Sequence, residues 1–143
     1  MSQTAPPTRE EVNALITRGP YHQWLGLKVL AFAEDAIEIE ATYRDEWRVR
    51  ADAPYTHGGI LAALVDLAAD WALAYRLGRA QPTIDMRVDY HRPAGPGNLL
   101  AKGRVIRCGR QFSVCEAQIL DVNGEMVASG RGTYLTAPAP AAT

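Results

Sequence analysis

Two glycines and two aspartates in residues 55–71, YTHGGILAALVDLAADW, have the types and spacing that could support chemistry. Gly58 and Gly59 stand where a helix is expected to begin, and a helix N-terminus presents unpaired backbone N–H groups and partial positive charge. Because glycine has no side chain to block the approach, a carbonyl oxygen could dock on these N–H groups and be polarised, as in an oxyanion hole. Alternatively, the glycines only allow a tight passage from loop to helix, and the spacing alone does not decide between the two.

Asp66 and Asp70 interrupt the same helix, which is otherwise apolar on nearly every side. An ionised carboxylate in an enclosed helix is costly unless it is paired or functional. The neighbours of Asp66 one turn away are mostly alanines, so this face could admit a partner or an acyl group. Asp66 could then act as a general base or as a nucleophile, or it could hold a backbone or arginine group. For Asp70 we expect a structural contact with an arginine or a neighbouring loop.

The elements that position these residues are predicted from hydrophobic spacing. Apolar residues trace two faces of a long helix over about residues 58–77, which Gly78 ends, and a short helix with a threonine cap is expected over 8–18. Period-two alternation and turn residues predict strands over residues 26–35, 36–44, 83–90, 99–108, 112–122 and 125–135. Within 83–90 the alternation is strict, and Asn123-Gly124 predicts a hairpin between the last two strands. An antiparallel sheet must bury its apolar face, so we expect an α+β fold in which the sheet wraps around helix 58–77.

Composition limits the class of protein and of partner. The length of 143 residues fits one domain, expected over residues 8–135, with flexible ends at 1–7 and 136–143. A formal net charge of −1 gives no field for nucleic acid or an anionic membrane, so neither partner is expected. Without a signal peptide pattern, a membrane span or a disulfide or metal spacing of its two cysteines, the chain is predicted to be cytoplasmic and to use no metal or redox cofactor.

The segment HGGILAALVD, followed in order by TIDMRVDYHRPA, CGRQF and DVNGEMVASGRGTY, resembles the hotdog-fold acyl-CoA thioesterases of the phenylacetate-degradation and 4-hydroxybenzoyl-CoA type. The resemblance covers roughly residues 20–135. It implies hydrolysis of an acyl-CoA thioester to a free acid and CoA. It also implies a homodimer or a dimer-of-dimers tetramer, with Gly58 of one chain facing Asp66 of the other across the interface.

The same resemblance suggests roles for individual residues. Asp66 becomes the catalytic acidic residue, and the Gly58 N–H becomes the oxyanion donor with Gly59 beside it in the substrate-binding passage. His57 is either structural or orients the carbonyl. Thr83 falls where the family carries a Ser or Thr that binds the attacking water or the acidic residue, although a threonine at the start of a strand needs no such role.

Two arginines are candidates for the CoA phosphates: Arg110 in CGRQ and Arg92 in HRPA, which could equally be ordinary solvated turn charges. One departure concerns the asparagine that many relatives carry six residues before the HGG histidine, because Ala51 stands there. Either the loop has shifted in register, so that Arg50 or Asp52 replaces it, or the site works without this contact. A hotdog hydratase or dehydratase and a non-catalytic acyl-CoA-binding module remain as alternative functions.

Overall fold

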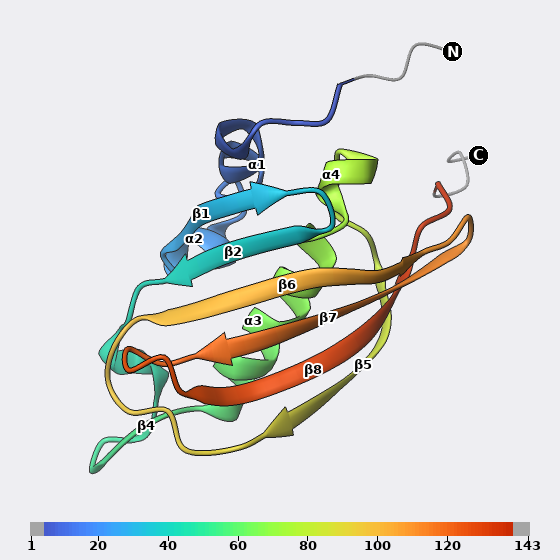
Figure 1. Ribbon diagram of the computed structural model, residues 1–143. Helices are drawn as coiled ribbons and strands as arrows, with labels where there is room; N and C mark the ends of the chain where they lie inside the picture. Colours follow the sequence, from blue (N-terminus) through green and yellow to red (C-terminus); the bar gives the residue numbers. More distant parts are fainter. Residues whose placement is uncertain (1–4, 139–143) are drawn as a thin grey trace, which may run out of the picture.

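The computed structural model describes residues 5–138, and its largest element is a six-stranded antiparallel sheet with the order β1-β2-β6-β7-β8-β5 (Figure 1). The strands are β1 (Leu27–Ala33), β2 (Ala36–Ala41), β5 (Thr83–Tyr90), β6 (Leu99–Cys108), β7 (Phe112–Leu120) and β8 (Met126–Leu135). A separate hairpin pairs β3 (Arg48–Arg50) with β4 (Ala53–Thr56). The helices are α1 (Arg9–Ile16), α2 (Pro20–Trp24), α3 (Gly58–Trp71) and α4 (Ala74–Leu77), and a 3-10 turn, η1, covers Asp45–Trp47.

Helix α3 lies across one face of the sheet, behind β6, β7 and β8 in the view of Figure 1. The approach is close: a Cβ added at Gly103 of β6 would collide with the carbonyl oxygen of Ala68. Glycine in the middle of a strand therefore lets the helix backbone touch the sheet. The sheet covers the helix as the sequence predicted.

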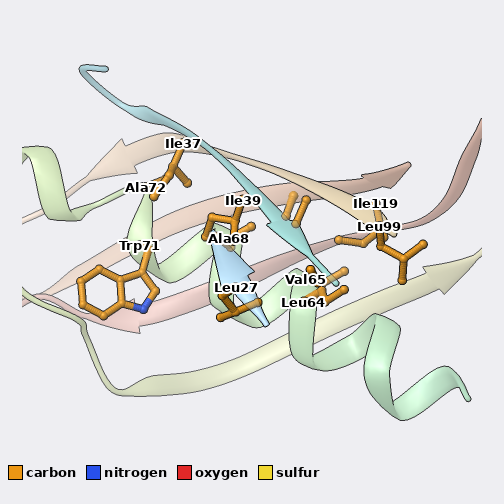
Figure 2. Close-up of a cluster of buried hydrophobic side chains, with 14 of the residues drawn as sticks. Leu27, Ile37, Ile39, Leu64, Val65, Ala68, Trp71, Ala72, Leu99 and Ile119 are labelled. Carbon is orange, nitrogen blue, oxygen red and sulfur yellow. The ribbon is translucent and has the colours of Figure 1, made fainter. Parts of the chain in front are cut away.

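The core lies between α3 and the sheet and is mostly aliphatic, with Trp71 at one end of the part that Figure 2 shows. The largest fully buried side chains are those of Trp47 and Tyr134. Helix α1 adds Val12 and Ile16, both almost fully buried. The capping box expected at residue 8 is present, since the Thr8 hydroxyl accepts from the Glu11 N–H and the Glu11 carboxylate accepts from the Thr8 N–H. The core members labelled in Figure 2 are Leu27, Ile37, Ile39, Leu64, Val65, Ala68, Trp71, Ala72, Leu99 and Ile119.

The central helix is shorter than predicted. Instead of one helix over residues 58–77, α3 ends at Trp71 and α4 follows after a two-residue break. At the break the Leu73 N–H bonds to the Asp70 carbonyl, three residues back instead of four, so the last turn tightens. Apolar spacing continues through this break because residues 72–74 remain buried, so periodicity could not reveal it. Gly78, with φ of 67°, ends α4 as expected.

Strand β5 is an edge of the sheet, and its predicted strict alternation is wrong at one residue. The pairing with β8 shifts between Thr83 and Asp85, so Ile84 is an extra, bulged residue. A bulge moves every residue on one side of it to the opposite face. As a result, Thr83 faces α3, whereas unbroken alternation would have placed it on the outer face with Asp85 and Arg87.

Three further segments were not predicted or differ in detail: α2, η1 and the β3–β4 hairpin. The turn at Asn123-Gly124 is present, but five residues, 121–125, join β7 and β8, and among them only Gly124 has a positive φ (76°). At the C-terminal end, packing continues past residue 135, because Thr136 is buried and its N–H bonds to the Gln111 carbonyl. Residues 1–4 and 139–143 of the two predicted flexible ends lie outside the described residues. Within residues 5–138, no helix combines the length and apolar character needed to cross a bilayer.

Candidate active site

Asp66 lies on the side of α3 that the sheet leaves partly open, together with Ala62 and Ala63. Two hydroxyl groups bond to its carboxylate: Thr83 Oγ1 donates to Oδ1 at 2.8 Å, and Tyr134 Oη donates to the same oxygen at 3.3 Å. Among residues 5–138, no hydrogen bond or ion pair engages the other oxygen, Oδ2. The carboxylate is thus held in place through one oxygen and has the other available for a water or an electrophile.

Tyr134 is the site residue that sequence reasoning missed. Its side chain is fully buried, and burial, together with the negative charge of Asp66, raises the pKa of its hydroxyl above the ordinary value. It therefore remains a protonated donor to Asp66. A signal was present in GRGTY: a Cβ at Gly132 would lie 2.5 Å from Tyr134 Oη, so the glycine two residues earlier on the same strand face makes room for the ring.

At the start of α3, His57 is the N-cap residue. Its Nδ1 accepts the Gly59 N–H at 2.8 Å, which occupies that donor. Gly59 can therefore offer a substrate no free N–H, and its contribution is limited to the space left by the absence of a side chain. The Gly58 N–H has no acceptor in the described part of the chain, so it is the donor that remains for a carbonyl oxygen.

Gly58 also has a structural reason to be glycine. The Tyr90 hydroxyl donates to the Gly58 carbonyl at 3.1 Å, and a Cβ at Gly58 would lie 3.2 Å from the Tyr90 ring. Both interpretations of this glycine, tight packing and an accessible N–H, are compatible with the geometry.

Asp66 and Gly58 do not meet within one chain. They are eight residues apart on one helix, which corresponds to about 12 Å along its axis. Each instead lies near a different end of β5, with Thr83 beside Asp66 and Tyr90 beside Gly58. A single thioester carbonyl cannot contact both groups of the same chain.

The enclosed carboxylate is Asp70, not Asp66. Only 9% of Asp70 is exposed, and its Oδ1 accepts the backbone N–H of Gln81 at 2.7 Å, which is the loop contact that the sequence suggested. Burial raises the pKa of Asp70 to about 7, although the Gln81 N–H and the nearby Arg79 act in the opposite direction.

The two candidate CoA-binding arginines lie near opposite ends of β5. Arg92 pairs with Glu125 at 2.8 Å, and both are exposed. Arg110 is exposed in the β6–β7 turn, and no acidic side chain within residues 5–138 pairs with it. Its neighbour Gln111 bonds to Thr136, so the turn lies at the end of β8 that carries Tyr134.

The remaining candidate groups lie apart from this site in a single chain. Ala51 occupies the exposed turn of the β3–β4 hairpin, where Arg50 and Asp52 pair with each other at 3.1 Å. Burial raises the pKa of Cys115 to about 12, so its thiol stays protonated. In residues 5–138, no group of three or more His, Cys, Asp or Glu side chains could hold a metal ion.

The chain matches a known protein family in the segment that carries these residues. Residues 53–128, which contain the α3 N-terminus, Asp66 and Thr83, match the family model described as thioesterase superfamily. An X-ray structure of a thioesterase-superfamily protein is 45% identical with a TM-score of 0.86, over 89% of this chain and 96% of its own.

Two other relatives extend the comparison. A medium/long-chain acyl-CoA thioesterase of Salmonella typhimurium, YigI, is 27% identical over 136 residues, which cover 81% of this chain and 84% of its own. The Escherichia coli PaaI protein from the phenylacetic acid degradation operon shares the fold, with 24% identity, a TM-score of 0.73 and coverage of 88% and 90%. These structures confirm the hotdog fold expected from the sequence. Because the matched segment covers more than half of the chain, including α3 and β5, the chain belongs to the thioesterase superfamily.

Proposed function

We propose that this protein hydrolyses acyl-CoA thioesters to a free carboxylic acid and CoA, with Asp66 as the reacting carboxylate. The observation that carries the proposal is the state of that carboxylate: two hydroxyls fix Oδ1, and Oδ2 is unengaged on the open face of α3. The acyl-CoA substrate is supported by the similarity to YigI, and its chain length stays open to assay.

Two copies are required to complete the site in this proposal. Strand β5 is an unpaired edge on which Ile84, Met86 and Tyr90 are exposed, and an apolar edge strand favours pairing with another chain. Two copies of β5 that pair antiparallel about a twofold axis run in opposite directions. The Thr83 end of one copy then lies beside the Tyr90 end of the other, which brings Asp66 close to Gly58 of the second copy. A further pairing of two such dimers would give the tetramer expected from the family resemblance.

The proposed reaction has two possible routes through the same residues. In the first, Asp66 Oδ2 takes a proton from water while the water oxygen attacks the thioester carbon, and the Gly58 N–H of the second copy stabilises the oxyanion. The C–S bond then breaks and the sulfur of CoA leaves with the proton. In the second, Oδ2 attacks the carbonyl and releases CoA, and water hydrolyses the resulting mixed anhydride. In both routes Thr83 and Tyr134 hold the carboxylate through Oδ1.

The first test is Asp66→Asn, assayed by thiol release across short, medium-chain, long-chain and aromatic acyl-CoAs. Turnover should fall by roughly 10²–10⁴, the range for a positioned base. Asp85→Asn is the matched control, since Asp85 is an exposed carboxylate on the outer face of the neighbouring strand β5. Near wild-type turnover of Asp66→Asn would exclude Asp66 as the reacting group. Conversion of an unsaturated acyl-CoA without thiol release would favour a hydratase, and binding without turnover would favour a binding module.

The second test asks whether the site is shared between copies. Gly58→Pro removes the N–H at the first helical position, where proline is tolerated by the backbone, and the extended ψ of 135° at His57 suits a residue before proline. Because an added Cβ lies 3.2 Å from the Tyr90 ring, Gly58→Ala, which keeps the N–H, is the matched control and should stay active. Asp66→Ala and Gly58→Pro should each be inactive alone. Mixed dimers of the two should regain activity, because one of their two sites combines an intact Asp66 with an intact Gly58. No recovery from a mixture shown to exchange subunits would refute the shared site.

A further inference from the structure

We propose that Asp70 is a positioning residue that acts on the reaction through Thr83, an inference that rests on the proposed function. The carboxylate of Asp70 accepts the backbone N–H of Gln81 at 2.7 Å, and Gln81 stands two residues before Thr83. Asp70 and Gln81 are 9% and 4% exposed, so neither is placed to touch a substrate directly. The contact instead fixes the segment that leads into β5.

The contacts form a closed ring that begins and ends on α3. Asp66 and Asp70 are one helical turn apart. From Asp66 the ring passes to the Thr83 hydroxyl, then back along the chain through Pro82 to Gln81, and returns to Asp70. The helix that carries the reacting carboxylate therefore also carries the anchor for the hydroxyl that holds it. A shift of the loop relative to α3 would break the 2.8 Å Thr83–Asp66 bond.

Other bonds hold the loop to the sheet but not to the helix. The Arg79 guanidinium donates to the side-chain oxygen of Gln81 at 2.7 Å, and the Gln81 side-chain amide donates to the Arg79 backbone carbonyl at 2.7 Å. Arg79 also donates to the Thr136 carbonyl at 3.0 Å. The Leu135 N–H donates to the Pro82 carbonyl at 2.9 Å. In contrast to these bonds, the Asp70–Gln81 bond ties the loop to α3. It therefore sets how Thr83 lies relative to Asp66.

The bulge at Ile84 gives this anchor its effect. Thr83 faces α3 only because the bulge turns it away from the outer face of the sheet. The Thr83 side chain is exposed in the single chain and lies at the first residue of β5, where the preceding loop sets its position. The loop before the bulge is thus the element that must be held for the hydroxyl to stay on Asp66.

A double-mutant cycle with thiol release as the assay tests the inference. Thr83→Ala and Asp70→Ala should each lower kcat about tenfold, with KM nearly unchanged, because each removes the same carboxylate-positioning bond. The double variant should also lose about tenfold, since Asp70 has no hydroxyl left to position. A loss of about a hundredfold would mean that the two residues act independently, and would overturn the inference.

Asp70→Asn supplies the conservative comparison, because its carbonyl oxygen can still accept the Gln81 N–H. It should keep kcat within about threefold of the wild type. A folded Asp70→Asn that loses as much as Asp70→Ala would show that the charge of Asp70 matters and not its hydrogen bond. If Asp70→Ala does not fold, Asp70→Leu removes the acceptor while filling the space.

A readout without activity separates this inference from the proposed function. In a crystal structure of Asp70→Ala or Asp70→Leu, the Thr83 hydroxyl should have moved out of bonding distance of Asp66. A retained contact would overturn the inference whatever the enzyme does. A wild-type protein that releases no thiol would instead refute the proposed function, and the crystallographic comparison would still decide on Asp70.

Discussion

Replacing Asp70 by asparagine should remove a large part of the pH dependence of stability between about pH 4 and pH 7. The carboxyl group of Asp70 is 9% exposed, and burial raises its pKa from 3.8 to about 7. In the unfolded chain the same group titrates near its ordinary value. Between these two values the folded protein binds a proton that the unfolded chain has released, so stability falls as pH rises through this window.

The magnitude follows from the size of the shift. A displacement of one pKa unit corresponds to 1.36 kcal/mol, so a rise from 3.8 to about 7 makes the free energy of unfolding about 4 kcal/mol lower above pH 7 than below pH 4. This is a large fraction of the 5–15 kcal/mol that is typical of a domain. Two charged groups also act on Asp70: the negative charge of Asp66 raises its pKa, and the positive charge of Arg79 lowers it. Cys115 and Tyr134 stay uncharged in this window, because burial and, to a smaller extent, the charge of Asp70 raise their own pKa values.

The assay is urea unfolding of the wild type and Asp70→Asn at intervals from pH 4 to pH 8. The quantity to compare is the slope of the unfolding free energy with pH, since burying the asparagine amide group changes the absolute value equally at every pH. The difference between the two proteins should change by about 4 kcal/mol across the window. Asp85→Asn, at an exposed carboxylate, is the control for the removal of one acidic group. A constant difference between wild type and Asp70→Asn would refute the view that Asp70 keeps its proton to near pH 7.

Three further predictions concern the site. Arg110→Ala should raise KM for acyl-CoA at similar kcat, while a short thioester without the nucleotide is unaffected; an equal effect on both substrates would make Arg110 structural. Gly132→Ala should displace the Tyr134 ring, because the new methyl group would lie 2.5 Å from its hydroxyl, and should cost about 1–3 kcal/mol of stability in thermal or urea unfolding, with a lower kcat. Ala51→Asn should raise turnover several-fold if the site lacks only the family's amide contact, since one neutral hydrogen bond is worth about 0.5–1.5 kcal/mol; unchanged turnover would favour a shifted loop.

The arrangement of sheet and helix could be predicted from the sequence because both depend on long apolar patterns. A helix with two apolar flanks and a series of alternating strands have few ways to bury their surfaces. The Thr8 cap and the end at Gly78 were also readable, since each depends on a local residue type. The break at residues 72–73 was not, because a tightened turn between two buried helical segments changes no residue type and leaves the periodicity intact.

The contacts of Asp66 could be predicted only in part. Thr83 was placed near it by family resemblance, while alternation alone assigned Thr83 to the opposite face. The bulge at Ile84 explains the difference, because it turns Thr83 to the face of α3. One extra residue in an edge strand changes neither the composition nor the apparent alternation, so the sequence did not reveal it. Tyr134 was missed because a tyrosine on a buried strand face usually indicates packing. Its hydroxyl donates to Asp66, which lies 68 residues away in the chain, so no local pattern links the two.

The difference between the two aspartates shows why residue type and helix position did not suffice to assign their roles. Both occupy α3, one turn apart, and the sequence suggested that both carboxylates sit in an enclosed helix. The sheet covers Asp70 and leaves Asp66 on the open side of α3, so Asp70 is buried and Asp66 is partly exposed. Hydroxyl donors that leave one oxygen unengaged suit a group that must accept a proton or attack a carbon. A buried carboxylate with a backbone donor suits a group that must stay still. Because one loop connects the two contacts, Asp70 can hold Thr83, the partner of Asp66, and under the proposed function this contact is what the buried carboxylate contributes in return for its cost to stability.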